Sequence, residues 1–181
     1  MISFKQYLIE STAGGNYMSI GVEAPGISLR TLPYGIPNDG YECEPGKQHV
    51  TLIYSESSTI EPNALLAEVM AKFPQSLLAE IDHFECFDAL PKDGERDENK
   101  CTIVAKLHCP MLREIHDYLV SRGCKHSYDE YSPHMSLWYD CDRAKGHELA
   151  DKLNKYYRVP SLVLQYYKSD TIKKDWAKSQ D

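Results

Sequence analysis

The stretch Ser132-Pro133-His134-Met135-Ser136-Leu137-Trp138-Tyr139 decides the fold, because the chain holds a near copy of it at Gln48-His49-Val50-Thr51-Leu52-Ile53-Tyr54. Both segments follow the pattern His, apolar, Ser or Thr, Leu, bulky apolar, Tyr. With seven His in the chain, a single His-x-[Ser/Thr] is expected roughly once by chance. The agreement at three further positions therefore indicates an internal duplication.

The duplication extends beyond the two motifs. Ser76-Leu77 follows His49 at the same interval at which Ser161-Leu162 follows His134. One offset of 85 residues, the separation of His49 and His134, relates both pairs. The sequence therefore predicts two lobes of similar build.

Strand parity gives each motif two different faces, because alternate residues of a strand point to opposite sides. The parity groups His49, Thr51 and Ile53 in one copy, and His134, Ser136 and Trp138 in the other. The opposite face of the first copy holds Val50, Leu52 and Tyr54. A core does not accept an imidazole and a hydroxyl without partners, so the polar faces are predicted to line a cavity.

The composition limits the classes of protein to which the chain can belong. A chain of 181 residues with 42% apolar and 26% charged residues is typical of one well-buried globular domain. A net charge of −7 argues against a broad basic surface for long nucleic acid, but leaves room for a small anionic ligand held by local cations. The six cysteines form no Cys-x-x-Cys pair, and neither a secretory signal nor an apolar run of membrane-spanning length is evident. We expect reduced thiols in a cytoplasmic protein.

Periodicity and the positions of Pro and Gly predict the order of the elements. They are a helix at 1–11, a strand at 17–24, a loop at 25–47, the first motif strand, a helix from Pro62 to Pro74, an extended segment at 76–90, a connector at 91–100, a strand at 101–109, a helix from Pro110 to Gly123, the second motif strand, a helix at 144–157 and a strand at 161–167. Two lobes of this order predict an α+β fold with central motif strands and helices outside.

The loop at 25–47 is long for a compact domain and leads directly into the first motif. We expect its larger polar and aromatic side chains either to flank a bound substrate or to be solvated loop residues. These side chains are Arg30, Tyr34, Tyr41 and Lys47.

Residues 1–15 form a segment of their own, an amphipathic leader that ends at Gly14-Gly15. One interpretation is a loosely attached terminal helix. The leader also resembles the capsid-targeting propeptides of large tailed phages, which implies cleavage after Glu10 and packaging in the virion. Residues 16–181 are then the single bilobed domain.

Two imidazoles on opposite sides of one cleft suit in-line displacement at phosphorus. One removes a proton from the attacking oxygen while the other protonates the leaving oxygen. Hydroxyls and backbone N–H groups beside them can hold the non-bridging oxygens. The ordinary pKa of histidine, near 6.5, lets one ring be neutral and the other charged, so this chemistry needs no metal.

Two other chemistries compete with this hypothesis. A zinc site is disfavoured because no Asp, Glu or Cys recurs at ligand spacing beside His49 or His134. A nucleophilic Ser136 is disfavoured because nothing resembles Gly-x-Ser-x-Gly and the first motif has Thr51 in its place. The five remaining histidines are predicted to have no catalytic role: His83, His108, His116, His126 and His147.

The paired motifs resemble the signature of the 2H phosphoesterase superfamily over roughly residues 16 to 170. The resemblance implies a bilobed, pseudo-two-fold fold in which antiparallel sheets line a central cleft, and metal-independent cleavage of nucleotide phosphodiesters. It implies that His49 and His134 are the acid/base pair and that Thr51 and Ser136 bind phosphate oxygens. Ser136 departs from the commoner Thr but keeps the hydroxyl.

Within that superfamily, the leader and the chain length resemble the phage anti-CBASS enzymes, which destroy cyclic oligonucleotide signals of bacterial defence. The resemblance implies a substrate such as 3′,3′-cGAMP and no cofactor. Processing of RNA ends at a 2′,3′-cyclic phosphate, and nucleotide binding without turnover, are the alternatives. The oligomeric state stays open.

Four residues are expected to contact the bases of such a ligand: Tyr17, Trp138, Asp170 and Trp176. Stacking on an aromatic ring is the usual way in which a protein holds a base. Trp138 is placed there by strand parity, Trp176 by a tail that can close over the cleft, and Asp170 as a reader of a base edge. Packing in the floor of the lobe is the alternative for Trp138.

Overall fold

The computed structural model of the protein describes residues 16–56, 61–88, 97–125, 130–158 and 161–173, with backbone alone for 16–19, 56 and 170–173. The leader at 1–15 and Trp176 lie outside these ranges. In chain order the elements are β1 (Asn16–Glu23), the 3-10 helix η1 (Leu29–Thr31), β2 (Tyr41–Glu42), η2 (Pro45–Lys47), β3 (His49–Glu56), α2 (Pro62–Lys72), β4 (Ser76–Asp88), β5 (Lys100–His108), α3 (Pro110–Ser121), β6 (His134–Asp142), α4 (Arg143–Tyr156) and β7 (Ser161–Lys173).

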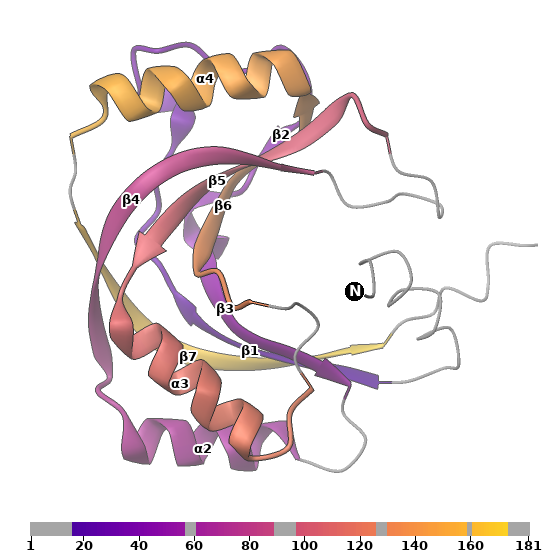
Figure 1. Ribbon diagram of the computed structural model, residues 1–181, viewed down its shortest axis with the longest axis vertical. Coiled ribbons are helices and arrows are strands. Elements are labelled where there is room, and N and C mark those ends of the chain that lie inside the picture. Colours follow the sequence, from indigo (N-terminus) through magenta and orange to yellow (C-terminus); the bar gives the residue numbers. More distant parts are fainter. Residues whose placement is uncertain (1–15, 57–60, 89–96, 126–129, 159–160, 174–181) are drawn as a thin grey trace, which may run out of the picture.

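The strands form one antiparallel sheet in the order β2-β6-β3-β1-β7-β4-β5, and β5 pairs with β6 as well. Six strands therefore make a closed circuit, and β2 is added to the free part of the β6 edge. The α+β class predicted from the sequence is confirmed, with one continuous sheet serving both lobes (Figure 1).

The duplication is visible in the strand boundaries. β3 begins at His49 and β6 at His134, while β4 runs from Ser76 to Asp88 and β7 from Ser161 to Lys173. The two long strands are both 13 residues in length, and the same offset of 85 relates their starts and their ends. The two halves of the chain thus build equivalent strands in equivalent order.

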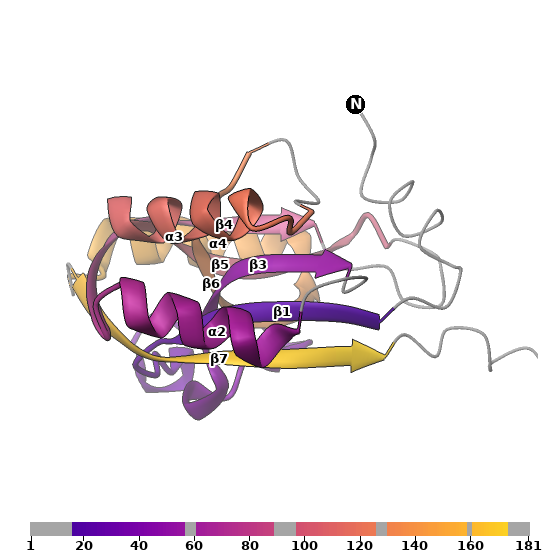
Figure 2. The same cartoon turned by 90° about the horizontal axis from the view of Figure 1, so that it is seen from below.

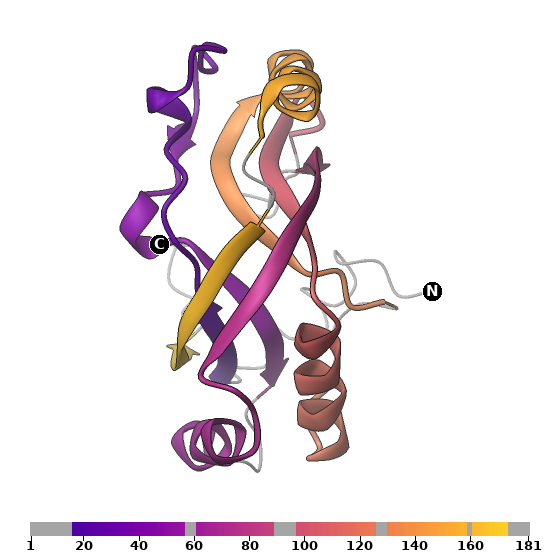
Figure 3. The ribbon, with the colours of Figure 1, turned by 90° about the vertical axis from the view of Figure 1, so that its left-hand side faces the viewer.

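The long strands β4 and β7 each pair with two neighbouring strands. Residues 76–80 of β4 pair with residues 161–165 of β7, after which β4 turns to β5 and β7 turns to β1. We call β1, β3 and the later part of β7 the first lobe, and β5, β6, β2 and the later part of β4 the second lobe. The crossing of β4 and β7 joins them on the side away from the motif strands (Figure 3).

Helices cover the outside of each lobe. α4 packs on β4, β5 and β6 of the second lobe, whereas α2 packs on β1 and β7 and α3 on β3 of the first lobe. Figure 2 shows α2 and α3 alongside the three strands of the first lobe. None of the described helices has the length and apolar character needed to cross a membrane.

The helix ends follow local chemistry. Glu61 and Asp142 cap α2 and α4 by accepting backbone N–H groups at 2.7 and 3.0 Å. Proline opens α2 at Pro62 and α3 at Pro110, where a missing N–H costs nothing. Gly123 ends α3 with a φ of 97°, a conformation that favours glycine. These boundaries agree with the predicted ones.

Each motif strand contains a β-bulge at the same place. On β3, Thr51 pairs with Gly21 and Ile53 with Ile20, so Leu52 is the extra residue. On β6, Ser136 pairs with Val104 and Trp138 with Ile103, so Leu137 is the extra residue. The two bulged leucines are again 85 residues apart.

The bulges overturn the strict parity expected from the sequence, because one extra residue exchanges the two faces of a strand. Ile53 and Trp138 are both only 2% exposed and belong to the core. Tyr54 and Tyr139, which parity placed on the core side, are half-buried instead. The prediction was therefore right for the His and the hydroxyl of each motif and wrong beyond the leucine.

Trp138 packs in the core, which was the alternative to a stacking role. Its indole N–H donates to the Asp39 carbonyl at 2.8 Å, and the Arg30 guanidinium lies 5.1 Å from the ring centroid. With 2% of its surface exposed, the ring offers no face for a nucleobase. The predicted stacking role of Trp138 does not fit this environment.

Gly146 marks the tightest contact between α4 and the sheet of the second lobe. A Cβ there would overlap the Cys101 Sγ and lie 3.0 and 3.1 Å from the Sγ atoms of Cys86 and Cys141. Alanine normally stabilises a helix by about 1 kcal/mol over glycine. The close thiols outweigh this preference, because overpacking a core costs about 1–3 kcal/mol.

We predict that Gly146→Ala lowers the free energy of unfolding, measured by urea denaturation. Gly46→Ala is the matched control, because nothing lies within 4 Å of a Cβ at Gly46. The control is expected to change stability by less than about 0.5 kcal/mol. A more stable Gly146→Ala variant would contradict the packing described.

Candidate active site

The pairing of Val50 with Met135 joins β3 to β6 and brings the two motifs together. Both side chains are fully buried. Their neighbours His49, Thr51, His134 and Ser136 are exposed or half-buried on the opposite face. In an antiparallel pair with this register, His49 lies across from Ser136 and Thr51 across from His134. Figure 1 shows β3 and β6 starting side by side and running apart.

Both imidazoles are held in the same way. The Nδ1 of His49 is 3.1 Å from the Lys47 carbonyl oxygen, and the Nδ1 of His134 is 2.8 Å from the Ser132 carbonyl oxygen. A carbonyl accepts only, so Nδ1 carries the proton in each ring. In the neutral ring the lone pair is then on Nε2, which can take up and release a proton. The backbone two residues upstream therefore fixes the tautomer in both lobes.

The environment favours the neutral form of His134. Burial lowers the pKa of the His134 imidazole below its usual value, and the charges of Lys106 and His49 lower it further. The Ser132 carbonyl and the Glu85 carboxylate act in the opposite direction. The rings of Phe87 and His134 pack edge to face, with centroids 4.7 Å apart. His49, by contrast, is exposed.

Lys106 is the cation of the site, and it was not singled out from the sequence. It pairs with His134 across β5 and β6, and its ammonium donates to the Ser132 hydroxyl and lies 3.5 Å from Glu85. The Lys106 side chain is only 16% exposed. The signal for it in the sequence was a single lysine within the otherwise uncharged strand 102–107.

The first lobe has a carboxylate where the second has Lys106. Glu23 pairs with His49 across β1 and β3, as Lys106 pairs with His134 across β5 and β6. Lys168 lies 3.6 Å from the Glu23 carboxylate. The two halves of the site thus share their histidines and hydroxyls but differ in charge. The duplicated site is chemically asymmetric.

Two aromatic side chains hold the bulge that positions Thr51. His116 Nδ1 bonds the Leu52 carbonyl at 2.7 Å, and the Tyr131 hydroxyl donates to the Thr51 carbonyl at 3.1 Å. The rings of His116 and Tyr131 stack with centroids 4.1 Å apart and an angle of 2°. His116 is buried, and its role is to support Thr51 from behind.

The Ser136 hydroxyl belongs to a small polar cluster. It interacts with the Tyr139 hydroxyl, which also interacts with the thiol of Cys43. Burial raises the pKa of Tyr139, so its hydroxyl stays protonated at neutral pH. The ring of Tyr139 in turn contacts Tyr41 at a centroid distance of 5.4 Å.

The four loop residues proposed as substrate neighbours lie in different environments. Arg30 pairs with Glu42 and covers Trp138, and Lys47 pairs with Glu44 at 2.8 Å. Tyr34 stacks on Tyr156 of α4. Of the four, Tyr41 is the one whose ring contacts Tyr139, the residue whose hydroxyl interacts with that of Ser136.

The other residues expected to contact a base are either described by their backbone alone or lie outside the described ranges. Tyr17 pairs with Ile172 and Asp170 with Ser19, so both are on the paired ends of β1 and β7 in the first lobe. The side chains of Tyr17 and Asp170 are not among those described, and neither is any part of Trp176. Their roles stay predictions.

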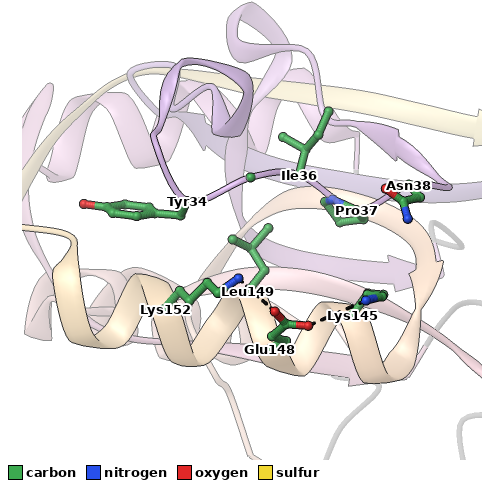
Figure 4. Close-up of a pocket in the computed structure, with 9 residues that line it drawn as sticks. Tyr34, Ile36, Pro37, Asn38, Lys145, Glu148, Leu149 and Lys152 are labelled. Carbon is green, nitrogen blue, oxygen red and sulfur yellow. Dashed lines mark hydrogen bonds and ion pairs between the residues drawn. The ribbon is translucent and has the colours of Figure 1, made fainter.

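A pocket lies between the loop at 34–38 and α4 (Figure 4). Its charged residues are already engaged with one another, since Glu148 pairs with Lys152 at 2.8 Å and with Lys145 at 3.8 Å. It is lined by neither motif. Within the described ranges, no three His, Cys, Asp or Glu side chains gather as metal ligands would.

The comparisons with known proteins agree with this geometry. A solved crystal structure described as a phosphoesterase has a TM-score of 0.50 and 14% identity, and the alignment covers 88% of this chain and 94% of the other. The chain therefore shares the fold of that protein. The family model of the anti-CBASS protein Acb1 matches residues 40–179, and the chain belongs to this family.

A curated relative, the anti-CBASS protein Acb1 of Vibrio phage KVP40, is 33% identical over 97 residues. The matched segment is 54% of this chain and 54% of the phage protein, about half the length of each. These findings confirm the resemblance inferred from the two motifs.

We predict that the pKa of His134, followed by NMR titration of its ring, lies below 6.5. Lys106→Gln removes a cation and should raise this pKa, whereas Glu85→Gln removes an anion and should lower it. The two variants are each other's control, because they alter the same ion pair with opposite expected signs. Shifts of the same sign in both would contradict the electrostatics of the site.

Proposed function

We propose that the protein is a metal-independent phosphodiesterase that hydrolyses cyclic di- or trinucleotide signals such as 3′,3′-cGAMP, and so counteracts bacterial CBASS defence. The observation that carries the proposal is the face at the β3–β6 junction, where two imidazoles with the same fixed tautomer stand beside two hydroxyls. Membership of the anti-CBASS protein Acb1 family supports the biological context.

We propose roles for the two histidines from the asymmetry of the site. His134, whose pKa is lowered, is the base: its Nε2 removes the proton from the attacking oxygen, either water or a ribose 2′-hydroxyl. As the new P–O bond forms, the bond from phosphorus to the 5′-oxygen breaks. Protonated His49 on the other side donates its Nε2 proton to that leaving oxygen, and the proton count balances.

Thr51 and Ser136 hold the non-bridging oxygens as negative charge develops. Lys106 adds a fixed positive charge beside His134, which favours an anionic phosphate in a chain of net charge −7. We assign the bases of the ligand in part to Tyr17, Asp170 and Trp176, in agreement with the position of β1 and β7 in the first lobe.

We predict that His49→Ala and His134→Ala each lower kcat by at least about 10²-fold, the usual scale for a positioned acid or base. Thr51→Ala and Ser136→Ala should lower it less, because they remove one hydrogen-bond donor each. Activity should persist in EDTA and show a bell-shaped pH profile, since the two rings act in opposite protonation states. His147→Ala, an exposed histidine on α4, is the matched control.

Two results would overturn this mechanism. One is loss of activity in chelator that zinc restores. The other is a covalent adduct on Ser136 together with a larger loss in Ser136→Ala than in either histidine variant, which would make Ser136 a nucleophile.

We predict that 3′,3′-linked cyclic dinucleotides give a linear product, detected by liquid chromatography and mass spectrometry. The compact site suits a small ligand, because a protein of net charge −7 repels a long polyanion. RNA ending in a 2′,3′-cyclic phosphate is the comparison substrate. Efficient opening of that end, with cyclic dinucleotides left intact, would establish RNA-end processing instead. Tight binding of cyclic dinucleotides without any product would indicate a binding module.

A further inference from the structure

Tyr41 and Tyr139 form an aromatic pair at one end of the active site. They are direct cross-strand neighbours on β2 and β6, with ring centroids 5.4 Å apart at an angle of 34°. Tyr41 is 55% exposed while Tyr139 is half-buried beneath it. A large aromatic ring is thus held in place by a partner while much of its surface stays open to solvent.

The bulge at Leu137 puts this pair on the catalytic face. It returns Tyr139 to the side of Ser136, and the hydroxyls of these two residues interact. Because Leu137 is the extra residue of the bulge, Tyr139 is about two strand steps along β6 from Ser136, roughly 7 Å at the rise of a β-strand. This spacing is suited to a base whose phosphate sits at Ser136.

The backbone beneath Tyr41 is clamped on both sides. Before it, the Asp39 carboxylate accepts from Lys100 and from the Asp142 N–H at 2.9 Å. After it, the Cys43 N–H donates to Leu137 at 2.9 Å. The pair is therefore preorganised, and binding does not have to order this segment.

We propose that Tyr41, backed by Tyr139, is a stacking platform for one nucleobase of the substrate; this rests on the phosphodiesterase function proposed above. A cyclic dinucleotide carries a base on each side of the scissile phosphate. Tyr17 and Asp170 are on the far ends of β1 and β7 in the first lobe, whereas β2 belongs to the second lobe (Figure 1). The platform serves the base that the first lobe does not hold.

The test is steady-state kinetics with 3′,3′-cGAMP. Tyr41→Ala should raise KM by about 5- to 150-fold, the range expected for loss of one stacked base, with kcat within a few-fold of wild type. Tyr41→Phe keeps the ring and should recover most of the affinity. Tyr156→Ala is the matched control, because Tyr156 is also an exposed tyrosine paired with a second one, Tyr34, but on α4. Its KM should equal that of wild type.

Calorimetric binding in a His134→Ala background separates the platform from the proposed function. If wild type turns over 3′,3′-cGAMP but Tyr41→Ala alters neither KM nor Kd, the platform is wrong and the enzyme stands. If wild type shows no turnover yet Tyr41→Ala weakens binding, the platform stands and the phosphodiesterase is wrong. An equal loss in Tyr41→Ala and Tyr156→Ala would also overturn the platform.

Discussion

The pairing of Val50 with Met135 is the contact on which the site depends. This pair sets the register between β3 and β6. Through it His49 and His134, which are 85 positions apart, lie on one face. Both side chains are fully buried, so slippage by one residue would move an apolar side chain out of the core. Burial therefore fixes the register, and the register sets His49 against Ser136 and Thr51 against His134. The geometry of the candidate site follows from packing on the opposite side of the strands.

The two bulges show a second way in which the core shapes the site. A strand with strict alternation would expose Ile53 and Trp138 beside the histidines, and large apolar surface there would be lost from the core. The extra residue at Leu52 and at Leu137 lets both copies bury two successive apolar side chains. It also turns Tyr54 and Tyr139 away from the core. At Leu52 the carbonyl oxygen contacts buried His116, so a histidine outside both motifs supports the first motif.

The sequence was enough to predict the fold class, the helix boundaries and the pairing of the two motifs, because each is written in local pattern or in the repeat. Pro62, Pro110 and Gly123 mark helix ends whatever lies around them. The bulges and the position of Trp138 were out of reach, since a bulge depends on register with a neighbouring strand. Lys106 could not be predicted as part of the site for the same reason. Its importance comes from standing opposite His134 on another strand, which no spacing along the chain reveals.

Duplication creates a difficulty for the proposed mechanism. Two identical half-sites would give two imidazoles of equal basicity, whereas displacement at phosphorus needs one neutral and one charged. Their hydrogen bonds to the backbone are indeed equivalent, so the difference must come from the surroundings. The second lobe supplies it with burial and with Lys106, both of which favour neutral His134. The first lobe leaves His49 exposed and places Glu23, a carboxylate, at the position equivalent to Lys106. A lysine beside one histidine and a glutamate beside the other thus make two copies of the same motif electrostatically different, as the proposed division into acid and base requires.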